Sequence, residues 1–174
     1  MRLNILIGGK AGQGINVISE IISEILTKKG YFVFNYRDYP SLIRGGHNFN
    51  VISISDKKIG SSEKIIQGII ALDENTIKIH KQNLASDGFI LDFEKFKELG
   101  KNLNIALAGA VIKILGIEKK VLLDAIKTKF NSEDALETID KGYDSQKEKF
   151  SLKEIKNNLK IMSGSEGIAR GALD

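Results

Sequence analysis

Apolar runs and amphipathic stretches alternate through the first half of the 174-residue chain, and together they predict an α/β fold. Residues 2–7, RLNILI, form a short apolar run closed by glycine, which is typical of a strand buried on both faces. Over residues 15–29, isoleucines recur at helical spacing, and polar side chains occupy the opposite face. Residues 31–36, YFVFNY, favour a second strand. Strand, glycine loop, helix and strand make a βαβ unit.

Three further strands are predicted over FNVISIS (49–55), GIIALD (68–73) and GFILDF (88–93). A hairpin between the first of these and the following IGSS would add an antiparallel pair and make the sheet mixed. Asp73 is positioned to cap a helix through ENTIKIHKQNL, which begins at residue 74.

Beyond Asn102 the pattern becomes helical, with two apolar stripes and a third, polar helix over 132–150 in which Gly142 is a weak point. The predicted fold class is therefore α/β: a three-layer α/β/α domain with a mostly parallel but mixed central sheet, a Rossmann-like start and a helical C-terminal half. Residues 161–174 are rich in small side chains and could form a disordered tail or the first piece of another domain.

Composition narrows the function classes. With 42% hydrophobic and 28% charged residues, the chain is expected to form one globular domain. No cysteine is present, so disulfides and cysteine-ligated clusters within this chain are excluded. The net charge of +4 comes from dispersed lysines, so no nucleic-acid partner is expected. Neither a signal peptide nor a membrane-spanning run is visible, so we expect a cytoplasmic location and no membrane partner.

Metal or acid–base chemistry is not indicated. No His, Asp and Glu residues reach metal-site spacing, and no metal is expected. His47 follows two glycines and could act as a general base, although a loop histidine more often bonds a neighbour. His80 lies in the lysine-rich stretch KIHKQ and is expected to be solvated. We therefore assign no catalytic residue.

The glycine loop after the first strand only approaches known phosphate motifs. Gly9, Ala11 and Gly14 occupy the three glycine places of the dinucleotide fingerprint, so alanine replaces the second. Asp38 could serve a ribose hydroxyl in that interpretation. Glycines before a helix still expose N–H groups at its positive end, and Gln13 can both donate and accept. The loop is either an anion contact or a tight turn.

The triphosphate motif fails outright. It needs a lysine and a hydroxyl residue directly after the last glycine, and Ile15 and Asn16 stand there instead. Without them the loop has neither a cation for the outer phosphates nor a magnesium ligand.

A second loop, YPSLIRGGHN, places an arginine next to two glycines, whose backbone can be approached closely. Arg44 precedes Gly45 and Gly46, which suits a phosphate or carboxylate, or else a salt bridge. If the strands before the two glycine loops are parallel, both loops emerge at the sheet end where open α/β sheets place ligands.

Three segments together resemble a known family: GGKAGQGINVISEIISEIL, GYFVFNYRDYPSLIRGGHNFNVISIS and IIALDENTI. They look like the γ domain of 2-oxoacid:ferredoxin oxidoreductases, which many of these enzymes fuse to the front of the α subunit. The tail GSEGIARGALD is similar to the opening of the α domain. The resemblance thus divides the chain into a γ-type domain, 1–160, and a linker or truncated start of the thiamine diphosphate-binding, pyrimidine-type α domain, 161–174.

The resemblance implies an enzyme complex that oxidatively decarboxylates a 2-oxoacid such as pyruvate, 2-oxoglutarate or 2-oxoisovalerate to an acyl-CoA. Thiamine diphosphate and iron–sulfur clusters would lie in partner domains or subunits, with α and β chains and ferredoxin as partners. The γ domain would help close the active site, contact coenzyme A and assist assembly, and this fragment alone would be inactive. Whether the isolated chain forms a homo-oligomer is left open by the sequence.

Carried over residue by residue, the resemblance implies that seven positions bind cofactor: Gly12, Gln13, Gly14, Tyr39, Arg44, Gly45 and Gly46. Lys10 and Arg44 are the expected partners of coenzyme A phosphates. The alternative is a stand-alone Rossmann-like protein that binds a dinucleotide or a small anion.

Overall fold

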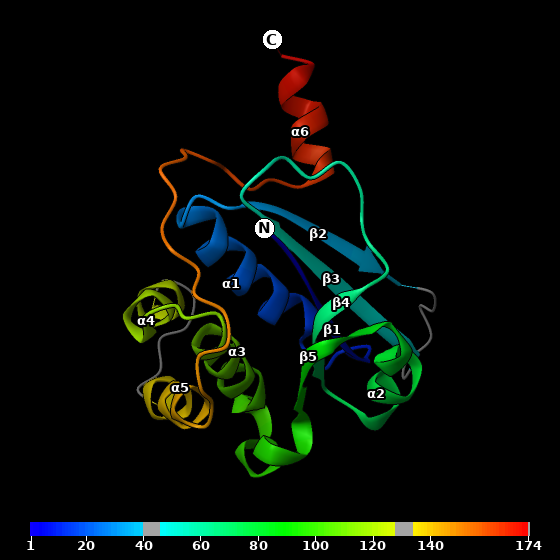
Figure 1. Ribbon diagram of the computed structural model, residues 1–174, viewed down its shortest axis with the longest axis vertical. Coiled ribbons are helices and arrows are strands. Elements are labelled where there is room, and N and C mark those ends of the chain that lie inside the picture. Colours follow the sequence, from blue (N-terminus) through cyan, green and yellow to red (C-terminus); the bar gives the residue numbers. More distant parts are fainter. Residues whose placement is uncertain (40–45, 128–133, 174) are drawn as a thin grey trace.

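The computed structural model describes residues 1–39, 46–127 and 134–173, and it contains a five-stranded sheet in the order β2-β3-β1-β4-β5 (Figure 1). The strands are β1 (Arg2–Lys10), β2 (Phe32–Asp38), β3 (His47–Ser55), β4 (Ile66–Ala71) and β5 (Leu84–Asp92). β3 is antiparallel to both β2 and β1, whereas β4 is parallel to both β1 and β5. Four strands therefore share one direction, and the predicted mostly parallel but mixed sheet is confirmed.

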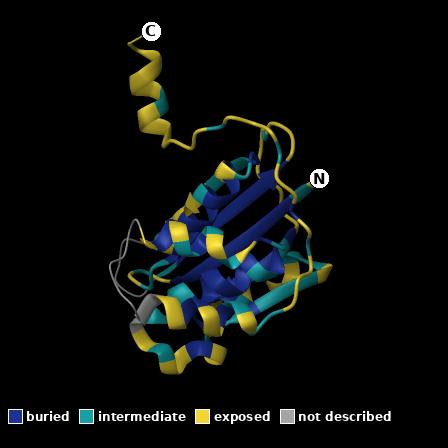
Figure 2. Ribbon diagram, turned by 90° about the vertical axis from the view of Figure 1, so that its left-hand side faces the viewer, coloured by how far each residue is buried: buried dark blue, intermediate teal, exposed yellow. Residues whose placement is uncertain are grey.

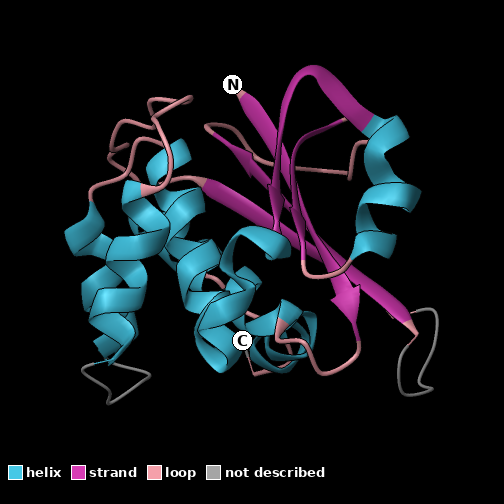
Figure 3. Cartoon of the chain, turned by 90° about the horizontal axis from the view of Figure 1, so that it is seen from below, coloured by secondary structure: helices cyan, strands magenta, loops and turns pink. Residues whose placement is uncertain are grey.

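Helices cover both faces of the sheet in the described residues. They are α1 (Ile15–Lys28), α2 (Glu74–His80), α3 (Leu103–Ile114), α4 (Lys119–Lys127), α5 (Asp134–Asp144) and α6 (Gly164–Gly171), with 3-10 turns η1 (Lys81–Asn83) and η2 (Phe93–Asn102). Seen from below, α2 lies on one side of the sheet, and the larger helical group lies on the other (Figure 3). The three-layer prediction is confirmed, with layers of unequal size.

The alternation of side chains along β1 explains these layers. Ile5 and Ile7 join α1, α3 and α4 in the main core, whereas Leu6 between them packs in a smaller core with Ile77 of α2. α1 buries its isoleucine face against the sheet, and the three central strands β1, β3 and β4 are almost continuously buried (Figure 2). Asp73 caps α2 by accepting from Thr76 N, as predicted.

The antiparallel pairing arises in a different place from the predicted one. The IGSS segment forms no strand, and β3 instead pairs back with β2, its predecessor in the chain. Residues 56–65 are irregular because Asn4, fully buried in β1, ties them down: its Nδ2 donates to Ile65 O at 3.0 Å and to Glu63. The segment that was expected to form a second hairpin strand is therefore held by hydrogen bonds to the buried Asn4 amide.

Gly142 is not a weak point but the position of closest approach between α3 and α5. A Cβ built there would collide with the carbonyl oxygen of Ala106, and one built on Gly109 would lie 2.8 Å from Ile139 O. Both glycines let the helix backbones touch, so α3 is buried on nearly all sides. The low helix propensity of glycine suggested an unstable position in the helix. The structure shows instead that the close packing of α5 on α3 requires glycine there.

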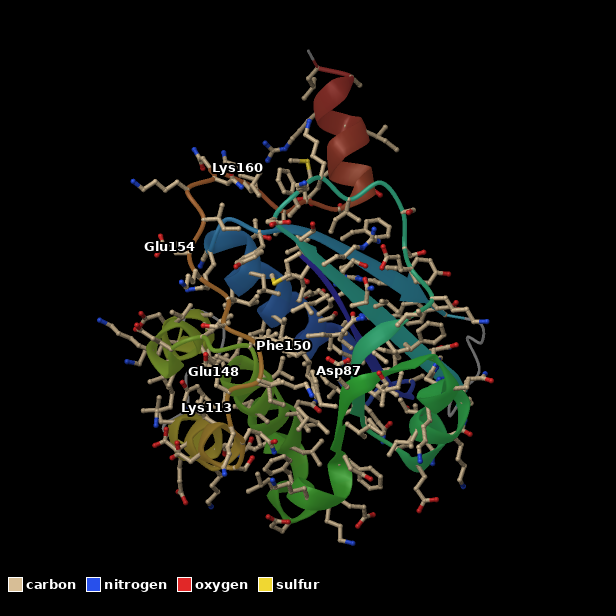
Figure 4. All side chains as sticks on the ribbon, viewed as in Figure 1. Asp87, Lys113, Glu148, Phe150, Glu154 and Lys160 are labelled. Carbon is tan, nitrogen blue, oxygen red and sulfur yellow. The ribbon has the colours of Figure 1, made fainter. Side chains whose placement is uncertain are left out.

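After α5, residues 146–162, here called the strap, run without regular secondary structure along the ends of α3 and α1. Phe150 N donates to Ile114 O at the end of α3, Leu152 N donates to Leu115 O directly after it, and Ile155 N donates to Lys29 O. Glu154 and Lys160 point outward, whereas Phe150 faces the body of the domain (Figure 4).

α6 follows the strap and projects from the domain with no buried residue (Figures 1 and 2). Its first turn is held by a capping box between Ser163 and Glu166. Of the helices in the described ranges, none has both the length and the apolar character needed to cross a membrane.

Candidate functional site

The two glycine loops meet at one end of the sheet, as predicted. Lys10, the last residue of β1, pairs with His47, the first of β3, and Asp38 ends β2 beside Phe49. Ala11 N donates to Gly46 O at 3.3 Å, which joins the loops directly. This end is the carboxyl end of the four codirectional strands, where α/β sheets place their ligands.

The first loop uses two glycines in conformations that other residues avoid. Gly12 has φ of 93° and Gly14 has φ of 84°, and Gly14 immediately precedes α1. A Cβ at Gly12 would meet open space, whereas one at Gly14 would collide with the Asn104 amide. That amide donates to Gln13 O at 2.9 Å, so α3 also fixes the loop. The sequence carried no signal for Asn104.

Gln13 supports the loop from inside through two hydrogen bonds. Its Oε1 accepts from Lys10 N, and its Nε2 donates to Leu72 O at 3.1 Å. The side chain therefore links the carboxyl ends of β1 and β4. Gly9 makes room for it, since a Cβ there would lie 2.6 Å from Gln13 Oε1.

The gap between β1 and β4 is the topological switch point of the sheet, because β1 leads through α1 toward one edge and β4 leads through α2 toward the other. A cavity of about 420 Å³ lies there. Its lining residues are Lys10, Gln13, Leu72, Asp73, Glu74, Asn75, Lys78 and Phe93. Among the charged lining residues, Glu74 and Lys78 pair with each other and Asp73 accepts from Thr76 as the cap of α2, whereas the described residues offer Lys10 no ion pair.

Tyr39 directly follows β2 and contacts the first turn of α1. Its side chain is exposed, and its hydroxyl oxygen accepts from Asn16 Nδ2. Asn16 Oδ1 in turn accepts from Asn50 Nδ2 at 2.9 Å, and the same amide donates to Ser19 Oγ at 2.7 Å. A polar chain therefore runs from the interface of α1 with β3 out to Tyr39.

His47 and His80 form a pair on the α2 side of the same sheet end, with their Nε2 atoms 2.9 Å apart. Burial first, and the charge of His47 second, lower the pKa of His80 to about 4, against a smaller opposing effect of Asp38. Burial also lowers the pKa of His47, although Asp73 and Asp38 oppose this. The prediction that His80 is solvated was wrong, because His80 shares the buried face of α2 with Thr76.

The remaining predicted residues are placed as far as the structure allows. Gly46 accepts from Ala11 in the contact described above, and Lys10 is exposed. Arg44 and Gly45 lie outside the described residues.

Asp38 accepts from Tyr36 Oη at 3.1 Å, and β3 separates its strand from β1. Two strand spacings amount to about 10 Å, so Asp38 lacks the place beside the glycine loop that a ribose partner needs. Within the described ranges, no three metal-ligating side chains gather.

Part of the sequence matches known proteins. Residues 4–97 match the family model described as pyruvate ferredoxin/flavodoxin oxidoreductase. A 2-oxoacid:ferredoxin oxidoreductase subunit alpha from Sulfolobus sp is 35% identical over 80 residues, which are 46% of this chain and 13% of the relative. The chain thus matches about an eighth of the length of that relative.

Solved structures show the fold. A 2-oxoglutarate:ferredoxin oxidoreductase from Magnetococcus marinus, with 2-oxoglutarate, coenzyme A and succinyl-CoA bound, matches 99% of this chain and 37% of its own, with TM-score 0.79 and 18% identity. The gamma subunit of a keto/oxoacid ferredoxin oxidoreductase from Geobacter sulfurreducens matches 83% of this chain and 95% of its own, with TM-score 0.68 and 18% identity. The fold is therefore that of a γ subunit, and the chain belongs to the pyruvate ferredoxin/flavodoxin oxidoreductase family.

Proposed function

We propose that this chain is the γ-type part of a thiamine diphosphate- and iron–sulfur-dependent 2-oxoacid:ferredoxin oxidoreductase, and that its joined glycine loops contact coenzyme A. The observation that carries the proposal is the Ala11–Gly46 contact, since it makes one surface of two loops at the ligand-binding end of the sheet. The partner chains would supply thiamine diphosphate, the clusters and the exit of electrons to ferredoxin.

The described residues at this end fit an anionic ligand. Lys10 is exposed, with no ion pair in the described structure, and Tyr39 presents an exposed hydroxyl. α1 is 14 residues long, and its first N–H groups have no partner within the helix. Coenzyme A, when bound, supplies the thiol that accepts the acyl group. This chain would bind and orient its phosphates and would exclude water from the active site.

The division of the chain at residue 160 belongs to the same proposal. Among the described residues, the last side-chain bond from the strap to the domain is donated by Asn157 to Gly30 O, and α6 beyond Ser163 has no buried residue. This supports residues 161–174 as a linker or as the start of an α domain. The similarity to subunits named alpha supports a fused αγ subunit.

The experiment is reconstitution with the α and β partners, followed by turnover on a panel of 2-oxoacids at varied coenzyme A. Lys10→Met should raise the KM for coenzyme A about five- to tenfold, because an exposed charge contact to phosphate is lost, and should leave the KM for the 2-oxoacid unchanged. Lys57→Met is the control, since Lys57 is exposed and follows β3 at the far end of the sheet.

An unchanged KM for coenzyme A in the Lys10 variant would remove the first loop from the site. Absence of any coenzyme A-dependent turnover in the wild-type complex would overturn the function itself. Tight NAD binding by the isolated chain, measured by calorimetry, would instead support a stand-alone dinucleotide-binding protein.

A further inference from the structure

The contact between α1 and β3 contains two fully buried polar side chains where apolar packing would be expected. Ser19 is 0% exposed and Asn50 is 1% exposed. Burying an amide costs about 1–3 kcal/mol unless it is hydrogen-bonded. Here the bonds form a continuous chain through Asn16 to the exposed Tyr39, so the cost is offset by bonds that lead to the surface.

The donor and acceptor roles along this series of hydrogen bonds follow from its buried end, at Ser19. Ser19 Oγ donates to Asn16 O at 3.0 Å, so the hydroxyl hydrogen is engaged and the oxygen must accept from Asn50 Nδ2. With its amide nitrogen turned that way, Asn50 also donates to Asn16 Oδ1. The nitrogen of Asn16 is then the atom that faces Tyr39.

An amide nitrogen donates and has no lone pair with which to accept. The phenol oxygen of Tyr39 is therefore the acceptor in its bond with Asn16, and the phenol hydrogen stays available. Tyr39 is 46% exposed and lies at the end of the sheet where the two glycine loops meet. This series of hydrogen bonds therefore leaves the Tyr39 hydroxyl as a hydrogen-bond donor at this surface.

We propose that Asn50 and Asn16 are positioning residues that hold the Tyr39 hydroxyl as a donor to an anionic oxygen of coenzyme A. The proposal rests on the function given above and adds to it a specific donor and the residues that set its direction. Neither asparagine needs to touch the ligand, because both act through the phenol oxygen.

The test is a double-mutant cycle in the reconstituted enzyme with Tyr39→Phe, Asn50→Ala and the double variant. Tyr39→Phe should raise the KM for coenzyme A, and the Kd measured by calorimetry, about five- to tenfold. Asn50→Ala should raise them by a similar factor. The double variant should be no worse than Tyr39→Phe, since Asn50 acts only through the hydroxyl. The KM for the 2-oxoacid should not change.

Ser53→Ala controls for loss of a buried polar group. Ser53 also lies on β3 and is 0% exposed, but it donates to Asn4 Oδ1 and has no link to Tyr39. It should lower thermal stability without changing the Kd for coenzyme A. Tyr39→Phe alters an exposed residue, so it tests the proposal even if Asn50→Ala does not fold.

A normal Kd for coenzyme A in Tyr39→Phe would overturn the proposal, and so would multiplication of the two effects in the double variant. In both cases coenzyme A-dependent turnover by the wild type would leave the proposed function standing. If the wild-type complex neither binds coenzyme A nor depends on it, the proposed function and this inference both fall.

Discussion

His47 Nε2 and His80 Nε2 lie 2.9 Å apart, so one imidazole must donate to the other and both cannot be protonated without repulsion. These are the two histidines of the sequence. Any histidine-linked acid sensitivity of folding is therefore assigned to this one contact between β3 and α2.

Acid should weaken the fold through this pair. Burial lowers the pKa of His80 to about 4 in the folded protein, well below its ordinary value of 6.5. The unfolded chain therefore binds more protons between pH 6.5 and 4, and the free energy of unfolding falls as the pH falls through that window. The expected loss from His80 between pH 7 and 5 is about 2 kcal/mol. Urea titrations at the two pH values measure it.

His80→Gln keeps a neutral polar side chain and removes the titration. Its unfolding free energy should change less between pH 7 and 5 than that of the wild type. Equal pH dependence in both proteins would show that the histidine pair is not the acid-sensitive contact.

Gln13→Glu should loosen the glycine loop, because a carboxylate can still accept from Lys10 N but cannot donate to Leu72 O. Two acceptors would then face each other in a half-buried place, at a cost of about 1–3 kcal/mol in the free energy of unfolding. Gln82→Glu is the control, since Gln82 donates to Ile79 O from an exposed position where water can replace it. Equal denaturant midpoints for the two variants would contradict a bridging role for Gln13.

Gly142→Ala should destabilise the helical layer despite the better helix propensity of alanine. The new methyl group would collide with the Ala106 carbonyl, and overpacking of this kind costs about 1–3 kcal/mol. Gly167→Ala, in the exposed helix α6, has only an ordinary contact at 3.8 Å and should leave the main unfolding transition in place. Thermal unfolding of both variants measures the difference, and a Gly142 variant as stable as wild type would mean that the crossing adjusts freely.

Gly116→Ala should free the strap. Gly116 has φ of 69°, and a Cβ there would strike the Phe150 carbonyl. Gly12→Ala is the control for the cost of a positive φ, because Gly12 has φ of 93° and a Cβ there would meet open space. Limited trypsin digestion should cut the strap lysines faster in the Gly116 variant alone. Equal acceleration in both variants would attribute the effect to backbone strain and not to the strap contact.

The sequence predicted the strands, the first two helices and the meeting of the two loops, because these depend on short-range periodicity and on the direction of strands. It did not predict the burial of His80. Its spacing of four residues from Thr76 was a usable signal, but the neighbouring lysines outweighed it.

Long-range amide contacts were beyond sequence reasoning. Asn4, Asn50 and Asn104 each find partners more than thirty positions away, and a lone asparagine carries no pattern that reveals such a partner. The bond between Gln13 and Leu72 was hidden for the same reason. The Gln13 amide donates to the carbonyl of Leu72, which the parallel pairing of β1 and β4 brings close.

The strap also determines how the domain would respond to mechanical load. Its bonds to α3 and then to the end of α1 are arranged one after another along the chain, between the helical layer and α6. Tension applied at α6 would load these bonds one after another, beginning with those from Asn157 and Ile155 to the turn between α1 and β2 and reaching the bonds to the end of α3 later. A pull on α6 would therefore enter the domain at the end of the sheet opposite to the two joined loops.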